Sequence, residues 1–158
     1  LAYGDAISIV LAKSKGFSKD DFSVFHPGGK IGSSFIKSVD IMRHHDDMPI
    51  VNLDDNIEKI IEVISSKSIG STAVLNSEGR LEGIITDGDL RRNLTDNILA
   101  KSAQDIMSSK PQFVTTSSSA LEAVNIMQKL KITTIFVLED NKPQGVVHIH
   151  DCFKAGLI

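Results

Sequence analysis

The chain has 158 residues, of which 41% are hydrophobic, and its formal net charge is −3. This length and composition suit one globular core or two small ones. The lysines and arginines are scattered, and no apolar stretch approaches the roughly 20 residues that span a bilayer, so neither nucleic acid nor a membrane is expected as a partner. The single cysteine, Cys152, argues against a disulfide framework, favours a cytoplasmic location and is expected to be a small buried hydrophobe.

Two helices are expected in the N-terminal part of the chain. Apolar residues recur at helical spacing over residues 1–15, and Gly16 follows at the position where a left-handed residue is favoured. A second, short helix is expected after Ser18, ending at the Pro-Gly-Gly of residues 27–29. The sequence begins at Leu1 in the middle of a helical pattern, which predicts that it is a piece of a longer protein.

From residue 40 onward the chain repeats itself. The sequence DIM at 40–42 recurs 65 residues later, IGSTAVL at 69–75 recurs 63 residues later as ITTIFVL, and GIITDGD at 83–89 recurs 62 residues later as GVVHIHD. Three matches at nearly one offset indicate two copies of a unit that buries its apolar face against its own copy. We therefore expect the functional site between the copies.

Each copy is predicted to contain a strand, a helix, two paired strands and a second helix. In the first copy we expect a strand at 49–51, a helix capped by Asp54 or Asp55, strands at 72–75 and 80–85, and a helix opened by Asp89 that includes Leu94 and Ile98. In the second copy we expect a strand at 114–115, a helix from Ser119, strands at 135–138 and 145–149, and a helix from Asp151.

These motifs resemble a tandem pair of CBS domains, also called a Bateman module. The resemblance covers about three quarters of the chain, from residue 40 to the C-terminus. It implies an α/β fold in which two β-α-β-β-α repeats, at 37–100 and 101–158, are related by pseudo-two-fold symmetry. It also implies two clefts between the repeats, one or both of which commonly hold an adenosine-type nucleotide or a related ligand.

The end of the first GIITDGD motif offers the groups that a nucleotide needs. Gly83 lets a backbone approach closely, Thr86 ends a strand and Asp89 begins a helix, so a hydroxyl, a carboxylate and free helix amides converge. The carboxylate could accept from both hydroxyls of a cis-diol, while Arg91 and Arg92 could neutralise a phosphate. The alternative is that Asp89 is only a helix cap and that both arginines are solvated.

The second copy departs from this pattern. His148 replaces Thr86, although Asp151 still matches Asp89, so the second cleft is expected to take another ligand or to stay empty. His148 and His150 stand two apart on a predicted strand, hence on one face, as two metal ligands would. No third ligand follows at a recognisable spacing, and no metal site is predicted.

The first 36 residues carry a combination of short motifs: GDA at 4–6, GF at 16–17, DF at 21–22, FHPGG at 25–29 and a glycine at 32. Together they resemble the end of a sugar isomerase (SIS) domain as found in D-arabinose-5-phosphate isomerases, where a CBS pair follows. The resemblance implies that the intact protein interconverts D-ribulose 5-phosphate and D-arabinose 5-phosphate for the synthesis of Kdo, a lipopolysaccharide sugar. It assigns His26 to the active site. The local sequence allows another role, in which His26 bonds the last carbonyls of a helix.

The leading hypothesis is a regulatory binding module of such an isomerase. It would sense a nucleotide or nucleotide-sugar, such as AMP, ATP or CMP-Kdo, and would require no other cofactor. A second hypothesis is a structural module whose CBS pairs self-associate with empty clefts, and a third is an independent CBS protein. Because no phosphate loop and no upstream acid or base partners are present in this sequence, the chain alone is expected to bind without turnover.

Overall fold

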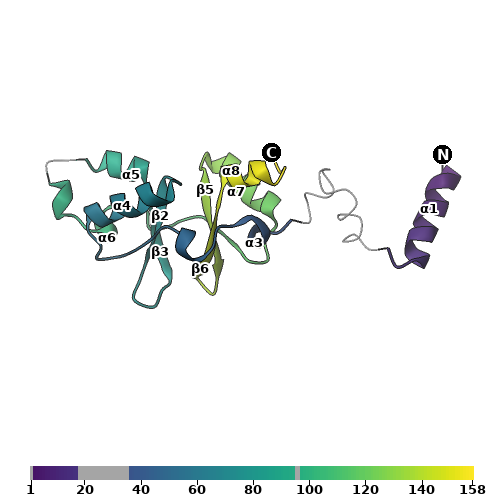
Figure 1. Cartoon of the computed structure of the whole chain (residues 1–158), viewed down its shortest axis with the longest axis horizontal. Coiled ribbons are helices and arrows are strands. Elements are labelled where there is room, and N and C mark those ends of the chain that lie inside the picture. The colour runs from purple at the N-terminus through teal and green to yellow at the C-terminus, as the bar shows by residue number, and fades with distance from the viewer. Residues whose placement is uncertain (1, 18–35, 95–96) are drawn as a thin grey trace.

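The computed structural model describes residues 2–17, 36–94 and 97–158 (Figure 1). Within these ranges it has two three-stranded sheets, with strand orders β1-β2-β3 and β4-β5-β6. The sheets lie side by side, with helices α4, α5 and α6 near the first and α3, α7 and α8 near the second (Figure 1). None of the helices in the described ranges is long and apolar enough to cross a membrane.

Both copies fold into the predicted order of elements. The first copy comprises β1 (Ile50–Asn52), α4 (Ile57–Lys67), β2 (Ser71–Leu75), β3 (Leu81–Thr86) and α5 (Asp87–Arg92). The second comprises β4 (Phe113–Thr115), α7 (Ala120–Leu130), β5 (Thr134–Glu139), β6 (Lys142–His148) and α8 (Ile149–Lys154). In each copy the first two strands pair in parallel across a helix, and the last two form an antiparallel hairpin. The predicted β-α-β-β-α repeat is therefore confirmed in both copies.

Several predicted helix ends are wrong, among them the start of α8, which is Ile149 and not Asp151. The cap of α4 is Asn56, whose side chain accepts from the Lys59 amide at 2.9 Å, whereas Asp55 accepts from the Asn52 amide and closes the turn before the helix. Helix α5 stops at Arg92, because Asn93 leaves the helical conformation, and a separate 3-10 turn forms at Ile98–Ala100. The apolar spacing of Leu90, Leu94 and Ile98 therefore overestimated the length of this helix.

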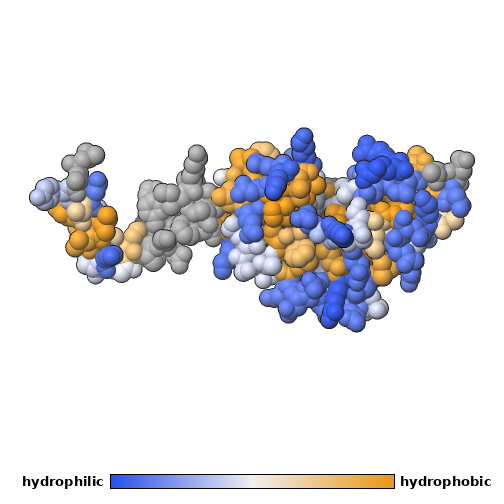
Figure 2. Space-filling view, turned by 180° about the vertical axis from the view of Figure 1, so that it is seen from behind, coloured by the Kyte–Doolittle hydropathy of each residue, from blue (hydrophilic) through white to orange (hydrophobic). Residues whose placement is uncertain are grey.

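Helix α1 (Ala2–Ser14) confirms the first predicted helix. Gly16 has a positive φ of 63°, and the Phe17 amide donates to the Ala12 carbonyl at 2.9 Å, which closes the helix end as expected. Several large apolar side chains of α1 are exposed and give it a hydrophobic surface (Figure 2). The predicted second helix and His26 lie outside the described residues.

Each DIM motif lies on the sheet of the other copy. The first leading segment (residues 36–43) contains α3 (Ser38–Ile41), and the second leading segment (residues 102–108) contains α6 (Ala103–Ile106). Arg43 exchanges two backbone hydrogen bonds with Val146 of β6, at 2.8 and 3.0 Å, and Ser108 exchanges two with Ile84 of β3, at 2.9 and 3.1 Å. The exchange is reciprocal, as a pseudo-two-fold arrangement requires.

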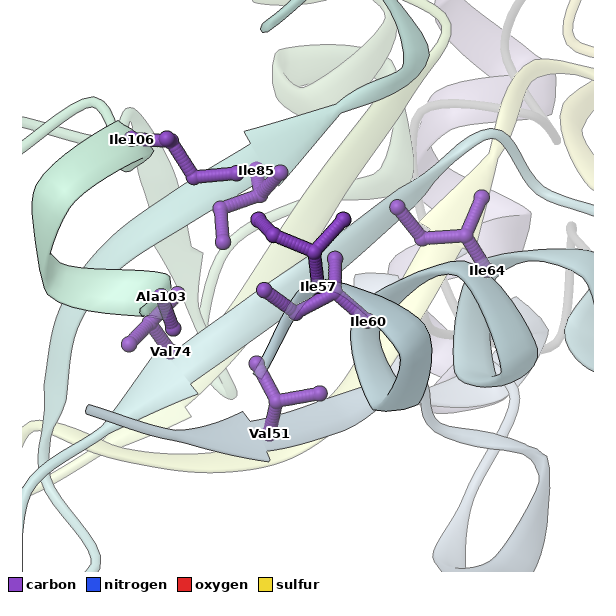
Figure 3. Close-up of a cluster of buried hydrophobic side chains, with 8 residues drawn as sticks. All are labelled: Val51, Ile57, Ile60, Ile64, Val74, Ile85, Ala103 and Ile106. Atoms are coloured by element: carbon purple, nitrogen blue, oxygen red, sulfur yellow. The ribbon is translucent and has the colours of Figure 1, made fainter. Parts of the chain in front are cut away.

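The leading segments also complete the hydrophobic cores. Ala103 and Ile106 of α6 point into the core of the first copy, against Val74 and Ile85 (Figure 3). Val39, Ile41 and Met42 pack in the same way against the core of the second copy. A third cluster joins the two sheets and contains buried residues from both copies: Ile69, Ala73, Phe136, Leu138 and Val146. Neither copy therefore buries its apolar surface alone.

We expect Gly145→Ala to destabilise the fold by about 1–3 kcal/mol, the usual cost of overpacking a close contact. A Cβ at Gly145 would clash with Met42 Sδ and lie 2.8 Å from the Arg43 carbonyl oxygen, and a backbone oxygen held in a strand-like bridge cannot move aside. Urea unfolding followed by circular dichroism measures the change. Gly4→Ala is the control, since a Cβ there meets nothing within 4 Å, and equal stability of the two variants would contradict the packing argument.

Candidate functional site

A cleft of about 440 Å³ lies between the two copies. The first copy contributes residues from the start of β2, the end of β3 and α5: Gly70, Ser71, Ile84, Thr86, Asp87, Gly88 and Arg91. The second contributes the turn before β5 and its first residue: Lys131, Ile132, Thr133 and Thr134. The predicted position of the functional site, between the copies, therefore coincides with a cleft whose walls come from both.

Ser71 is a buried polar residue of this cleft whose hydroxyl lacks a described partner. It is only 2% exposed, and its Oγ has no hydrogen-bond partner among the described residues. Thr134 holds the equivalent position in the second copy, and its Oγ1 donates across the seam to the Ile69 carbonyl at 3.2 Å. Because buried hydroxyls are nearly always hydrogen-bonded, the Ser71 hydroxyl is a group that a bound molecule could satisfy.

Thr86 lines the cleft, and it is also the residue that caps α5. Its Oγ1 accepts from the Asp89 amide at 3.2 Å and donates to Asp89 Oδ2 at 2.6 Å, while the Thr86 amide donates to the same carboxylate oxygen at 2.9 Å. This is a capping box, in which Thr86 is the cap and Asp89 is the third helical residue. The prediction that Asp89 itself opens the helix is therefore wrong by three residues.

Asp89 is not among the residues that line the cleft, and it is buried, with 6% of the residue exposed. Its second oxygen accepts from Arg92 Nη2 at 2.5 Å and from Ser108 Oγ, in the second leading segment, at 3.5 Å. Burial alone would raise the pKa of this carboxyl, but the hydrogen bonds from Thr86 and Arg92 outweigh burial and lower the pKa. Asp89 is therefore ionised at neutral pH, with both oxygens already hydrogen-bonded.

Gly83 allows a close approach, as predicted, but the group that approaches is part of the protein. A Cβ at this position would lie 2.6 Å from Met107 Sδ and 3.0 Å from the Ser108 carbonyl oxygen. Gly83 is thus needed where the second leading segment crosses β3, and it does not line the cleft. Gly145 has the same role against Met42 in the second copy.

The cleft carries two cations and one carboxylate. Arg91 and Lys131 enter it from opposite copies, and neither forms an ion pair with any described residue. The Arg91 Nε donates weakly to the Asp87 carbonyl, at 3.4 Å, which leaves the rest of its guanidinium free of described partners. The third charge is the Asp87 carboxylate on the same wall, so the cleft has an excess of positive charge.

The equivalent position in the second copy is built differently. His148 ends β6 and caps α8, and its Nδ1 accepts from the His150 amide at 3.3 Å. Burial, His150 and Arg43 lower the pKa of His148, so its ring is neutral at pH 7. His150 belongs to α8, so the prediction that the two histidines share a strand face is wrong. Within the described ranges no three His, Cys, Asp or Glu side chains gather as a metal site.

Asp151, the counterpart of Asp89, is held by the first leading segment. Arg43 Nε donates to Asp151 Oδ2 at 2.9 Å, and Arg43 Nη2 donates to Oδ1 at 3.3 Å. This half-buried, two-point ion pair engages both carboxylate oxygens. The neighbouring Cys152 is fully buried, as predicted, and burial followed by the charge of Asp151 raises the pKa of its thiol to about 11.

Sequence reasoning identified Thr86 and Arg91 as cleft residues but missed most of the opposite wall. Ser71 carried a usable signal, since it is a hydroxyl residue in an otherwise apolar strand motif. Lys131 and Thr133 carried none, because they reach the cleft only through the packing of one copy on the other. Arg43 was also missed, because its partner lies 108 residues away.

The profile of the CBS domain family matches the chain twice, at residues 38–96 and 103–157. An uncharacterised protein of Rickettsia prowazekii is 42% identical over 99% of the chain and 49% of its own length. The arabinose 5-phosphate isomerases KdsD of Yersinia pestis and of Escherichia coli K12 are 35% and 34% identical, over the whole chain and 49% of their own length. The chain thus spans about half the length of these relatives.

Solved structures share the fold. CBSX2 in complex with AMP has a TM-score of 0.68 and 20% identity over 77% of this chain and 96% of that chain. The CBS domain pair of protein MJ0100, in complex with 5′-methylthioadenosine and S-adenosyl-L-methionine, has a TM-score of 0.66 and 20% identity over 75% of this chain and 93% of that chain. These matches, with the two profile matches, confirm the predicted tandem CBS fold.

We expect Asp89→Asn to cost about 1 kcal/mol at pH 7, because the charged half of the capping box and its bond to Arg92 are lost. The pKa of Asp89 lies below its ordinary value of 3.8, so the stabilisation is present above that pH and is lost as the pH falls through the lowered value. Urea unfolding between pH 3 and pH 7 should show the stability difference narrowing below about pH 4. A difference that stays constant down to pH 3 would contradict this assignment.

Proposed function

Because the chain belongs to the CBS domain family and carries two copies of that domain, we propose that it senses a nucleotide or nucleotide-sugar. The ligand sits in the cleft bounded by Ser71, Thr86 and Thr134. A ligand held there touches both copies at once. Its binding free energy therefore depends on how the copies are packed, which is the property that a sensing module needs.

The observation that carries this proposal is the buried Ser71 hydroxyl. It has no hydrogen-bond partner among the described residues, although the equivalent Thr134 has one. Leaving a buried hydroxyl without a partner costs about 1–3 kcal/mol. A ligand that accepts from or donates to Ser71 recovers this free energy on binding, and such an arrangement is typical of a site prepared for a polar molecule.

The first probes follow from the relatives and from the cleft. The structure of CBSX2 contains AMP, and the structure of the MJ0100 domain pair contains two other adenosine compounds. Adenine nucleotides are therefore tested first. CMP and CMP-Kdo follow, because an end product of the route served by an arabinose 5-phosphate isomerase is a natural regulator of that enzyme. Hydroxyls and two free cations in the lining suit the ribose and phosphate of such compounds.

For the whole protein we propose the activity of its KdsD relatives, arabinose 5-phosphate isomerase. In this proposal residues 1–36 end the catalytic SIS domain, with His26 in its active site, and residues 37–100 and 101–158 form the two regulatory repeats. The ligand acts on catalysis through residues 31–39, which connect the catalytic part to the repeats. Self-association of CBS pairs would bring catalytic domains together and is compatible with sensing.

Ser71→Ala is expected to weaken ligand binding without weakening the fold. Loss of one hydrogen bond lowers affinity by roughly two- to tenfold, whereas the free protein keeps or gains stability because an unsatisfied buried hydroxyl is removed. Thermal shift with AMP, ATP, CMP and CMP-Kdo identifies the ligand, since a compound at 100 times its Kd stabilises the protein by about 2.7 kcal/mol. Calorimetry then compares the variants.

Thr134→Val is the matched control for Ser71→Ala. It removes the bond to the Ile69 carbonyl, so it should lower the stability of the free protein by about 1 kcal/mol. If no compound in the panel shifts the melting temperature of the wild type, the sensing proposal fails and a structural module with empty clefts is the better account. If Ser71→Ala instead destabilises the free protein as Thr134→Val does, the hydroxyl is structural.

A further inference from the structure

We propose that Arg91 and Lys131, one from each copy, bind a phosphate of the ligand and make this cleft selective for nucleotides over nucleosides. The inference rests on the proposed sensing function and adds the charge class of the ligand. The lining of the cleft contains these two cations and one carboxylate, that of Asp87. A cleft with two cations and one anion favours a ligand that carries negative charge.

Both cations are available for a ligand. Arg92, the neighbour of Arg91, is already bound to Asp89, whereas neither Arg91 nor Lys131 has a carboxylate partner among the described residues. Lysine offers three donors and arginine a planar fork, and both are common partners of phosphate oxygens. The hydroxyl of Thr133, on the wall opposite Arg91, adds a neutral donor.

The backbone conformation at the end of α7 positions the Lys131 side chain. Lys131 ends α7 with a positive φ of 56°, and its amide donates to the carbonyls of Gln128 and Met127. Residues other than glycine are uncommon in this conformation. Its counterpart Ser68 ends α4 in the same conformation, with φ of 54°. The two helix ends thus share one geometry but carry different chemistry.

The second copy lacks the same charges. By the spacing of the repeats, Arg91 corresponds to Phe153, Lys131 to Ser68, and Asp87 to Ile149. Phe153 instead lies in a group of three rings. Its ring centroid is 6.3 Å from that of His150, which is 5.1 Å from that of His148. The pseudo-symmetric position therefore offers no pair of free cations.

The carboxylate of the second position is also engaged. Asp151 is bound at two points by Arg43, whereas the residue equivalent to Arg43 in the other copy is Ser108, which reaches Asp89 only at 3.5 Å. Asp89 is likewise engaged, by Thr86 and Arg92, so the two positions differ in their free cations and not in their carboxylates. We therefore assign phosphate binding to the first cleft alone, with one nucleotide per chain.

The test compares each nucleotide with its own nucleoside by calorimetry on the full chain, using AMP against adenosine and CMP against cytidine. For the base that binds, the wild type should prefer the nucleotide by at least about tenfold, with one molecule per chain. Arg91→Gln and Lys131→Ser should each weaken nucleotide binding by about fivefold and leave nucleoside binding within twofold. The double variant should lose the preference. Lys131→Ser introduces the residue that Ser68 already places in this conformation, so the fold should tolerate it.

Two substitutions of exposed cations outside this cleft, Lys129→Gln and Arg80→Gln, are controls and should leave the preference unchanged. Raising the salt concentration should weaken nucleotide binding and spare nucleoside binding. Equal affinity of the wild type for nucleotide and nucleoside, equal loss of both in the variants, or a stoichiometry of two would overturn this inference while the sensing function stands. Absence of any binding to the wild type would remove the sensing function, and this inference with it.

Discussion

The reciprocal exchange of the two leading segments determines the architecture of this protein. Residues 36–43 pair with β6 and residues 102–108 pair with β3, so each copy receives the segment that precedes the other in the sequence. Backbone hydrogen bonds and the contacts of Met42 and Met107 with two glycines leave little freedom at either crossing. Because apolar residues of the segments fill the cores, the free energy that folds each copy also holds the pair together.

The cleft follows from this constraint. Once the sheets are held side by side, the start of β2 and the end of β3 face the turn before β5, and residues 63 positions apart become neighbours across the seam. Small differences between the copies then decide what the seam can do. The hydroxyl of Thr134 donates to a carbonyl of the protein, whereas the equivalent hydroxyl of Ser71 has no described partner. Arg43 forms an ion pair with Asp151, whereas its equivalent in the other copy, Ser108, offers Asp89 only a hydroxyl. Near symmetry thus produces two positions of different chemistry.

The sequence was sufficient to predict the duplicated fold but only one wall of the cleft. Apolar periodicity and repeated motifs locate strands and helices, because these depend on local spacing. The partners of Gly83, Asp89 and Asp151 depend on which copy each leading segment joins, and no local pattern encodes that choice. Lys131 was missed for the same reason, since it reaches the cleft through packing alone. The capping box was misread by three residues because threonine and aspartate are both good caps.

The most direct test of the exchange asks whether the two copies unfold together. The chain has no tryptophan, so Ile61→Trp in α4 and Phe113→Trp in β4, made as separate proteins at half-exposed positions, each report on one copy. For each variant, the urea midpoint measured by tryptophan fluorescence should equal the urea midpoint measured by far-ultraviolet circular dichroism. This is expected because neither core is stable without the other. A fluorescence midpoint that differs from the circular dichroism midpoint, with one copy melting first, would contradict the account.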